Sequence, residues 1–202
     1  MPNESDAFAR ALAVLKQYFG YASFRPAQAP VVQSLLARRD TVAIMPTGAG
    51  KSICFQVPAL LLPGVTLVIS PLISLMKDQC DALGDAGVPA TFINSTLSSA
   101  EWSARMQAIA AGDVKLVYVA PERLDTNAFE GLWSRVPVSM VAVDEAHCLS
   151  QWGHDFRPSY QTIAPFIARL PRRPIVSAFT ATATPEVRDD IVRLLSLDAP
   201  AV

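Results

Sequence analysis

Residues that build metal sites and disulfides are scarce in this sequence. Its 202 residues include three cysteines and two histidines, and Cys54, Cys80 and Cys148 stand far apart. No pair of these residues has the spacing of zinc ligands, and no disulfide framework is indicated. The sequence therefore predicts buried thiols and no zinc.

Long apolar runs and a targeting segment are also missing. No run approaches the roughly 20 residues that span a bilayer, and the best candidate, 58–65, contains Pro58 and Pro63. Residues 1–6 lack the basic segment and the apolar stretch of a secretory signal. We expect an intracellular, cytoplasmic protein without a membrane partner.

An excess of basic charge is absent too. The formal net charge is −1, from 17 basic and 18 acidic residues. Proteins that bind nucleic acid by themselves usually carry a basic patch. The charge balance argues against a self-sufficient DNA-binding protein, so any DNA contact has to come from local features or from parts of a larger protein.

What the sequence does contain is a regular alternation of strands and helices. Apolar runs typical of strands covered on both faces of a parallel sheet lie at 41–45, 65–70, 90–93, 116–120, 140–143 and 175–179. Helical patterns lie at 5–18, 26–38, 74–86, 98–111 and after Thr184, and Ser74, Ser98 and Thr184 are suited to cap the last three. This alternation predicts an α/β doubly wound fold, with a mostly parallel central sheet and helices on both faces.

A glycine-rich segment follows the first predicted strand. Residues 45–52, Met-Pro-Thr-Gly-Ala-Gly-Lys-Ser, lie between a strand and a helical stretch, which is the context of a P-loop. The backbone N–H groups of such a loop face phosphates, its lysine reaches the β and γ phosphates, and its serine ligates magnesium. Met45 stands where the strict pattern has glycine, and a glycine-rich turn with an incidental lysine is the alternative. The predicted nucleotide-binding residues of this loop are Thr47, Gly48, Ala49, Gly50, Lys51 and Ser52.

An acidic pair follows a later strand. Residues 139–143 run directly into Asp144-Glu145-Ala146-His147, and strand ends in such sheets open toward the ligand crevice. We expect Asp144 near the metal held by Ser52, Glu145 to orient the attacking water, and His147 to link this site to a neighbouring element. Alone, the segment would be interpreted as a solvated loop, but the upstream P-loop favours the functional interpretation.

Together these motifs resemble RecQ helicases of helicase superfamily 2, over about residues 19–197. Residues 19–21 and 24–28 are similar to the adenine-recognition motif of the family, with Ala27 where the family usually has glycine. The resemblance implies that Gln28 pairs with the N6 and N7 edge of adenine and that Tyr21 and Arg25 stack on its faces. The alternative is a helix start with a core aromatic residue and a solvated arginine.

Four further segments resemble family motifs. Residues 68–79 and 120–124 are similar to motifs that line the track of single-stranded DNA, 149–158 to the aromatic-rich loop that senses DNA and relays its occupancy to Glu145, and 178–183 to the motif that couples hydrolysis to movement. Plain strand-to-helix turns, and core packing of the aromatic residues, are the alternatives. The implied DNA-contacting residues are Pro71, Lys77, Arg123, Trp152, His154, Phe156 and Arg157, and the implied coupling residues are Thr180 and Thr182.

The resemblance implies the first RecA-like lobe of an ATP-dependent 3′-to-5′ DNA helicase in DNA repair and recombination, using ATP and Mg²⁺ on single-stranded or partially duplex DNA. We expect 1–202 to form that lobe, with adenine-recognition helices in 1–38 and a P-loop NTPase core in 39–202. Only 19 residues follow Ala183, so we expect the second RecA-like lobe, which would act in cis, and the zinc-binding and winged-helix regions to be absent. The fragment alone should then be nearly inactive.

In a bacterium it would be nucleoid-associated. A non-catalytic nucleotide-dependent binding module and an RNA helicase lobe are alternatives.

Overall fold

The computed structural model describes residues 4–202, apart from the side chains at positions 4, 127, 128 and 130. Its centre is a six-stranded sheet in the order β1-β6-β5-β2-β4-β3, and neighbouring strands pair in parallel throughout the described chain. The strands are β1 (Thr41–Ile44), β2 (Val65–Ile69), β3 (Ala90–Ile93), β4 (Leu116–Val119), β5 (Val138–Val143) and β6 (Ile175–Thr180).

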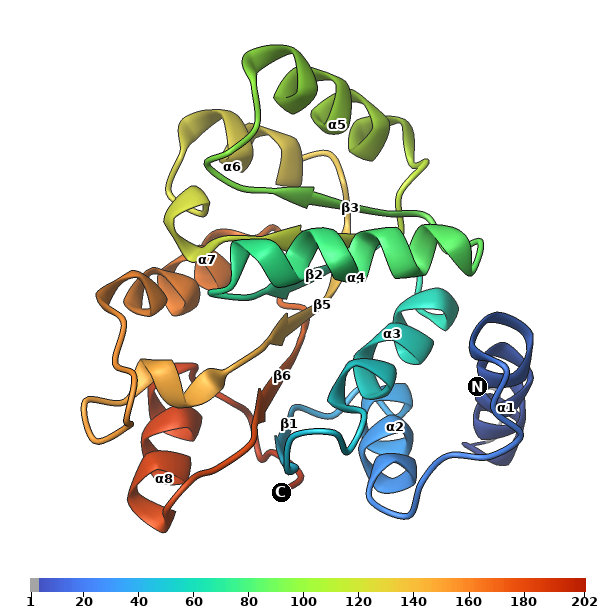
Figure 1. The fold of residues 1–202 in the computed structure, drawn as a ribbon. Helices are drawn as coiled ribbons and strands as arrows, with labels where there is room; N and C mark the ends of the chain where they lie inside the picture. The colour runs from blue at the N-terminus through green and yellow to red at the C-terminus, as the bar shows by residue number, and fades with distance from the viewer. Residues whose placement is uncertain (1–3) are drawn as a thin grey trace.

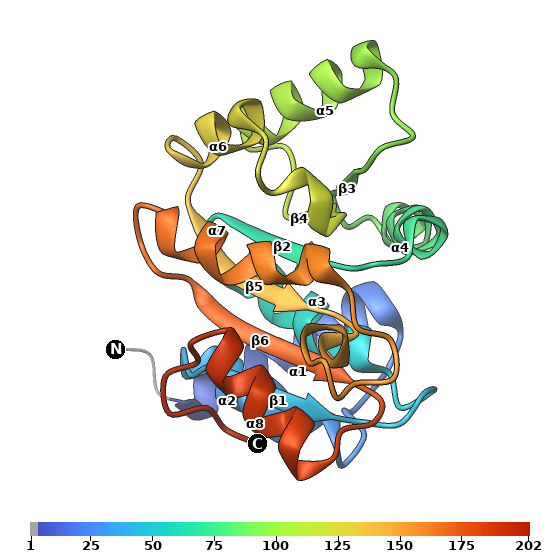
Figure 2. The same cartoon turned by 90° about the vertical axis from the view of Figure 1, so that its left-hand side faces the viewer.

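Helices cover both faces of the sheet (Figures 1 and 2). They are α1 (Glu4–Phe19), α2 (Gln28–Leu36), α3 (Lys51–Leu61), α4 (Ile73–Asp85), α5 (Ser99–Ala111), α6 (Asn127–Trp133), α7 (Ile163–Arg169) and α8 (Pro185–Leu194). Among residues 4–202, no helix combines the length and the apolar character that a bilayer span requires.

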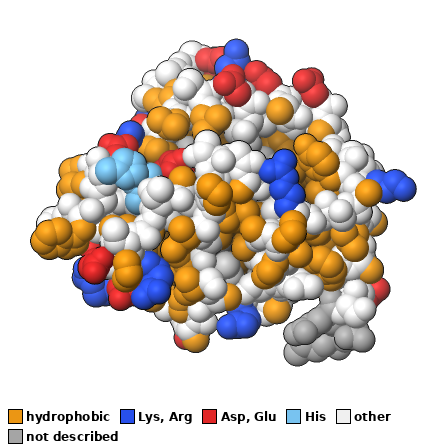
Figure 3. All heavy atoms as spheres, turned by 60° about the horizontal axis from the view of Figure 1, so that its bottom comes forward, with side chains coloured by type: hydrophobic (Ala, Val, Ile, Leu, Met, Phe, Trp, Pro, Cys, Tyr) orange, Lys and Arg blue, Asp and Glu red, His pale blue; other side chains and the backbone are white. Residues whose placement is uncertain are grey.

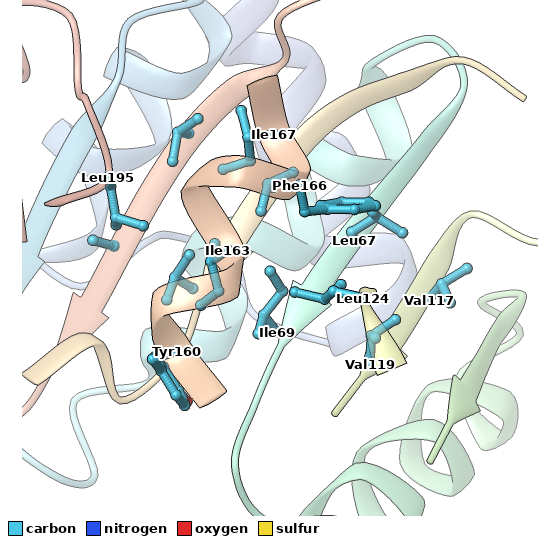
Figure 4. Close-up of a cluster of buried hydrophobic side chains, with 14 of the residues drawn as sticks. Leu67, Ile69, Val117, Val119, Leu124, Tyr160, Ile163, Phe166, Ile167 and Leu195 are labelled. Atoms are coloured by element: carbon cyan, nitrogen blue, oxygen red, sulfur yellow. The ribbon is translucent and has the colours of Figure 1, made fainter. Parts of the chain in front are cut away.

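Alternating residues of the central strands build two apolar layers. On β2, Leu67 and Ile69 lie in one buried cluster with Phe166 of α7 (Figure 4). Val68 lies in the opposite cluster, with Phe55 of α3. Because successive side chains of a strand point to opposite faces, a strand covered on both sides is apolar at every position. This explains the continuous apolar runs of the sequence.

The predicted fold class and all six predicted strands are confirmed, the strands to within two residues at each end. Ser98 caps α5 in a capping box with Glu101, and Thr184 caps α8. The predicted cap at Ser74 is wrong: α4 begins at Ile73, and no side chain caps it. The short helices α6 and α7 were not predicted, because seven residues give too few turns for an apolar periodicity to stand out.

The C-terminal segment returns to the start of the sheet. The N–H of Ala201 donates to the carbonyl of Asp40 at 2.9 Å. The buried Asp40 carboxylate accepts hydrogen bonds from the Arg173 guanidinium and from the N–H groups of Val176 and Asp198. These contacts tie the segment before β1 to the segment before β6 and to the last residues of the chain.

The strand order also determines where the motifs meet. β6 lies between β1 and β5, and because the strands are parallel their carboxyl ends share one edge of the sheet. The segments that follow β1, β5 and β6 therefore converge at that edge, as in other open α/β sheets.

Candidate active site at the carboxyl edge of the sheet

Residues 45–50 leave β1 as a loop that turns directly into α3. Gly48 and Gly50 have φ values of 80° and 78°, a left-handed conformation that glycine adopts without strain. A Cβ on Gly50 would also lie 2.5 Å from Nε2 of Gln28. Met45, where the strict pattern has glycine, is buried in the layer beneath α3. Position 50 thus requires glycine, whereas the Met45 side chain packs in the hydrophobic core.

Gln28 and Arg25 hold this loop from the N-terminal side. Gln28 Nε2 donates to the carbonyls of Ala49 and Gly50, each at 3.1 Å, and Arg25 Nη1 donates to Gly48 O at 2.6 Å. Gln28 is buried, whereas Tyr21 is 55% exposed. Because both Nε2 hydrogens of Gln28 are engaged, pairing with an adenine requires its amide to release one loop carbonyl.

Lys51 and Ser52 open α3. Lys51 Nζ donates to Met45 O at 3.3 Å. Ser52 lines a cavity of about 10 Å³ together with Asp144 and Ser70, which is close to the space that one water occupies. The buried hydroxyl of Ser70 has no hydrogen-bond partner in the described structure. Ser52 of α3, Ser70 after β2 and Asp144 after β5 therefore line one small space, together with Gln79 and Tyr118.

Asp144 follows β5, and its N–H donates to Ile69 O at 2.8 Å. Burial raises the pKa of its carboxyl from 3.8 to about 6, and the negative charge of Glu145 adds to the rise. The N–H of Glu145, 3.0 Å from Asp144 Oδ1, and the charge of Lys51 oppose it. Lys51 of the P-loop thus lies near enough to the predicted metal ligand to lower its pKa, although this is the smallest of the four effects.

Glu145 and His147 connect β5 to β6. Glu145 has a φ of 47°, which is strained for a residue with a side chain, and its Oε2 lies 3.4 Å from Nδ1 of His147. The same Nδ1 lies 3.0 Å from Oγ1 of Thr180. The Thr180 hydroxyl donates its hydrogen to Thr182 O at 3.0 Å, so its oxygen accepts the Nδ1–H of His147. Of the two predicted coupling residues, Thr180 contributes its hydroxyl and Thr182 its carbonyl.

The predicted aromatic loop stands out from the surface. Trp152 is 81% exposed, so core packing does not hold for this residue, and Phe156 is half-buried. The ring of His154 stacks on that of His147, with centroids 4.2 Å apart and planes 15° apart. A Cβ on Gly153 would lie 2.3 Å from His147 O. The loop is therefore pressed against the segment that carries Glu145.

Among the predicted DNA-contacting residues, Arg157 and Pro71 contact one another, whereas Lys77 and Arg123 lie on other segments. Arg157 Nη1 lies 3.4 Å from the carbonyl of Pro71, so the segments after β5 and β2 touch. Lys77 is exposed on α4, and Arg123 is half-buried in the turn after β4. Within residues 4–202, no hydrogen bond joins the side chain of Lys77 or Arg123 to Arg157 or Pro71.

Several hydrogen bonds that could not be predicted from the sequence hold these segments in place. The buried Tyr160 donates its hydroxyl to Asp144 O at 2.9 Å, and Ser150 donates to Asp190 of α8 at 2.7 Å. Gln56 donates to both Gln79 and Tyr118 at 3.0 Å. These partners lie 16 to 62 residues apart, and no motif or periodicity relates them.

A cavity of about 800 Å³ lies at the opposite end of the sheet, where β5 and β6 begin. Its lining includes Arg38, Arg135 and Arg173 and none of the predicted site residues. The chemistry of the motifs therefore belongs to the open carboxyl edge and not to this cavity.

A wholly parallel sheet with a P-loop after β1 and an acidic pair after β5 defines a RecA-like P-loop nucleotide-binding fold. The family model described as DEAD/DEAH box helicase matches residues 25–191, a range that holds the P-loop, Asp144 and Thr180. The chain belongs to the DEAD/DEAH box helicase family.

The chain is 52% identical over 189 residues to the ATP-dependent DNA helicase RecQ of Bacillus subtilis, covering 93% of this chain and 32% of that protein. It is 49% identical over 192 residues to the ATP-dependent DNA helicase RecQ of Pasteurella multocida, covering 95% and 30%. These similarities confirm the resemblance to RecQ helicases. The chain spans about a third of the length of these relatives.

A crystal structure of the DUF1998 helicase MrfA bound to DNA matches with a TM-score of 0.76 at 18% identity, covering 100% of this chain and 30% of that one. At this identity the likeness concerns the fold alone.

Proposed function

We propose that the chain is the first motor lobe of an ATP-dependent 3′-to-5′ DNA helicase of RecQ type that acts in DNA repair and recombination. The observation that carries the proposal is that Ser52 of the P-loop and Asp144 of the acidic pair line one cavity at the carboxyl edge of a parallel sheet, with the charge of Lys51 acting on Asp144. The match to the DEAD/DEAH box helicase family and the identity to RecQ helicases support a helicase lobe.

In the proposed site the P-loop holds the phosphates of ATP. The first N–H groups of α3 lack helical partners and point toward an anion. Lys51 leaves Met45 O, an uncharged acceptor at 3.3 Å, for the β and γ phosphates. Gln28 and Arg25, which brace the loop carbonyls, turn to the adenine, and the exposed ring of Tyr21 covers it.

Magnesium fits the oxygen atoms at this edge. Ser52 and Asp144 border a cavity of one-water size, and Ser70 adds a buried hydroxyl that has no partner in the described residues. Mg²⁺ prefers oxygen ligands and keeps several of its waters. Ser52 and Asp144 would hold the ion, which compensates the charge of the phosphates.

Glu145 orients the water that attacks the γ-phosphate, and His147 positions Glu145. The contact between Glu145 and His147, and the contact from His147 to Thr180, extend from the site to the end of β6. Trp152 offers an exposed ring to unpaired bases, and stacking of this kind contributes about 1–3 kcal/mol per base. The stacked ring of His154 joins that loop to His147.

The proposed site is only half of a catalytic centre. In the proposal a second RecA-like lobe in cis brings an arginine to the γ-phosphate, an effect of about 10³–10⁵ in rate where arginine fingers act. The open edge at Ser52 and Asp144 fits such a shared site, because a nucleotide on that edge would be covered by a facing surface.

Nucleotide binding by the 202-residue chain tests the proposal. A fluorescent ATP analogue with magnesium should bind, and Lys51→Ala should weaken that binding about 10- to 100-fold, because a charge-assisted hydrogen bond contributes roughly 1.5–3 kcal/mol. Lys16→Ala, an exposed lysine on α1, is the matched control. Equal affinities of the Lys51→Ala variant and the parent chain would overturn the assignment.

Turnover separates the alternatives. The 202-residue chain should show negligible DNA-stimulated hydrolysis, whereas a longer chain that carries both lobes should hydrolyse ATP when single-stranded DNA is added. A longer chain that binds ATP without turnover would be a non-catalytic module. Stronger stimulation by single-stranded RNA than by DNA would indicate an RNA helicase.

A further inference from the structure

The loop after β5 brings three donor atoms of different kinds together. A ring nitrogen of His147, Sγ of Cys148 and a carboxylate oxygen of Asp155 all lie within 4.8 Å of one another. The sulfur lies 3.8 Å from Nε2 and 3.8 Å from Oδ2 of Asp155. They meet because the loop closes on itself: the N–H of Arg157 donates to Cys148 O at 2.9 Å, and Gly153 lies against His147 O.

We propose that His147, Cys148 and Asp155 bind a zinc ion in a three-ligand site whose fourth position faces solvent. Imidazole nitrogen, thiolate sulfur and carboxylate oxygen are the donors that Zn²⁺ takes in proteins, and three protein ligands with one open position is an established zinc arrangement. The expectation of no zinc rested on spacing along the sequence, which does not reveal a site closed by a loop.

The distances fit such an ion. Two separations of 3.8 Å and a third of at most 4.8 Å leave a central point at most about 2.5 Å from all three atoms. Zinc bonds are about 2.3 Å to sulfur and about 2.0–2.2 Å to nitrogen and oxygen. In a tetrahedral site with these bonds the ligand atoms lie about 3.5 Å apart, so the two sulfur separations need to close by about 0.3 Å and the third, which is at most 4.8 Å, by up to about 1.3 Å.

The imidazole of His147 is already arranged as a ligand. Its Nδ1–H is directed to Thr180 Oγ1 and lies near the Glu145 carboxylate, so Nε2 carries the lone pair that faces Cys148. Ligating histidines usually donate their second N–H in this way, which fixes the tautomer and the ring. Burial lowers the pKa of His147, and the neighbouring His154 adds to the effect, so the ring is neutral at pH 7.

The thiol has to lose its proton when the ion binds. Burial raises the pKa of Cys148 to about 12, the charge of Asp155 adds to the rise, and Arg157 opposes it. Zn²⁺ takes the place of that proton: a zinc–sulfur bond forms, the S–H bond breaks, and one proton is released to solvent. Affinity should therefore rise with pH. The ion also competes with Arg157, whose Nε and Nη2 donate to Asp155 Oδ2 at 3.0 and 2.8 Å.

An ion can reach the site from the surface. Asp155 is exposed, whereas His147 and Cys148 are buried behind it. Figure 3 shows histidine at the surface, with acidic and basic side chains beside it; the ligand His147 is itself buried, and the exposed His154 stacks on it. A bound ion would link 147–148 to 155 and restrain the loop between them. Any effect of that restraint on DNA sensing rests on the proposed function, but the binding of the ion does not.

Cadmium titration of the untagged 202-residue chain, without nucleotide, tests the site. Cd²⁺ is the probe because its bond to a thiolate gives an ultraviolet charge-transfer band. We expect one equivalent of Cd²⁺ to produce the band, Zn²⁺ to displace it, and the affinity to rise about tenfold per pH unit around neutrality, as one proton is released. Hydrogen exchange at 148–157 should slow when Zn²⁺ is added.

Matched variants locate the ligands. Cys148→Ser should remove the band, whereas Cys80→Ser, another buried cysteine, should keep it. Asp155→Asn alters an exposed side chain and should weaken binding at least tenfold while the fold is retained. Absence of the band in the parent chain, or the same band in Cys148→Ser, would overturn the proposal. Failure of nucleotide binding in the same preparation would leave it untouched.

Discussion

Asp144 gives the sharpest prediction, because the charge that the proposed function needs is unfavourable for folding. Burial raises the pKa of its carboxyl from 3.8 to about 6, so the folded state disfavours the ionised form. The difference corresponds to about 3 kcal/mol of folding free energy at pH 7. Because the residue as a whole is half-buried, about 3 kcal/mol is an upper limit.

The pH dependence of the folding stability follows from the direction of this pKa change. Below about pH 3 the carboxyl is mostly neutral in both the folded and the unfolded chain, and it costs little stability. As the pH rises through 4 to 6, the unfolded chain ionises first, and stability is lost up to the full amount near pH 7. Asp144→Asn keeps the shape and the acceptor for the N–H of Glu145 but carries no charge. The variant should therefore be clearly more stable than the parent chain at pH 7, and more stable by less than about 1 kcal/mol at pH 4.

Urea unfolding of both chains at pH 4 and pH 7 measures this difference. A gain of 1–3 kcal/mol corresponds to a rise in Tm of roughly 2–12 °C for a domain of this size. Asp113→Asn, an exposed carboxyl after α5, should show no such gain. The reasoning fails if Asp144→Asn is no more stable than the parent at pH 7, or if its gain is as large at pH 4. The same variant should lose the dependence of nucleotide affinity on magnesium.

Two other substitutions test contacts that hold the fold, one beside the site and one at the opposite end of the sheet. Gly153→Ala should destabilise the chain by about 1–3 kcal/mol, because its Cβ would lie 2.3 Å from His147 O. Urea unfolding measures this loss, and Gly84→Ala, where a Cβ meets nothing within 4 Å, is the control. An equal loss of stability in both variants would contradict the close approach of Gly153 to His147. Asp40→Ala should lower the stability by about 1–3 kcal/mol, because it leaves the N–H of Val176 without its acceptor. An unchanged stability in thermal unfolding would contradict this role of Asp40.

Most strands of the sheet can be predicted from the sequence, because strands covered on both faces are continuously apolar. The P-loop and the acidic pair are readable for a related reason: each directly follows such a strand, and parallel strands align their carboxyl ends. The strand order was not readable. It places β6 between β1 and β5, and this order is set by packing between residues distant in the chain.

Contacts that cross between motifs could not be predicted from any one of them. The hydrogen bonds from Gln28 to the loop carbonyls and from Tyr160 to Asp144 O depend on how helices and turns stack. The cap predicted at Ser74 is wrong because α4 already includes Ile73 and Ser74: Leu72 is its N-cap residue, and no side chain caps the helix.

The two nitrogens of His147 divide the chemistry at this edge. Nδ1 faces Glu145 and Thr180 on the nucleotide side, and Nε2 faces Cys148 and Asp155 on the loop side. A neutral imidazole donates from one nitrogen and accepts at the other, so whatever binds Nε2 increases the polarity of the Nδ1–H bond. A change in the loop can therefore alter the hydrogen bonding of Glu145 without moving the backbone. His147→Gln offers one amide in place of two ring nitrogens, so it should weaken metal binding and leave nucleotide affinity near that of the parent chain.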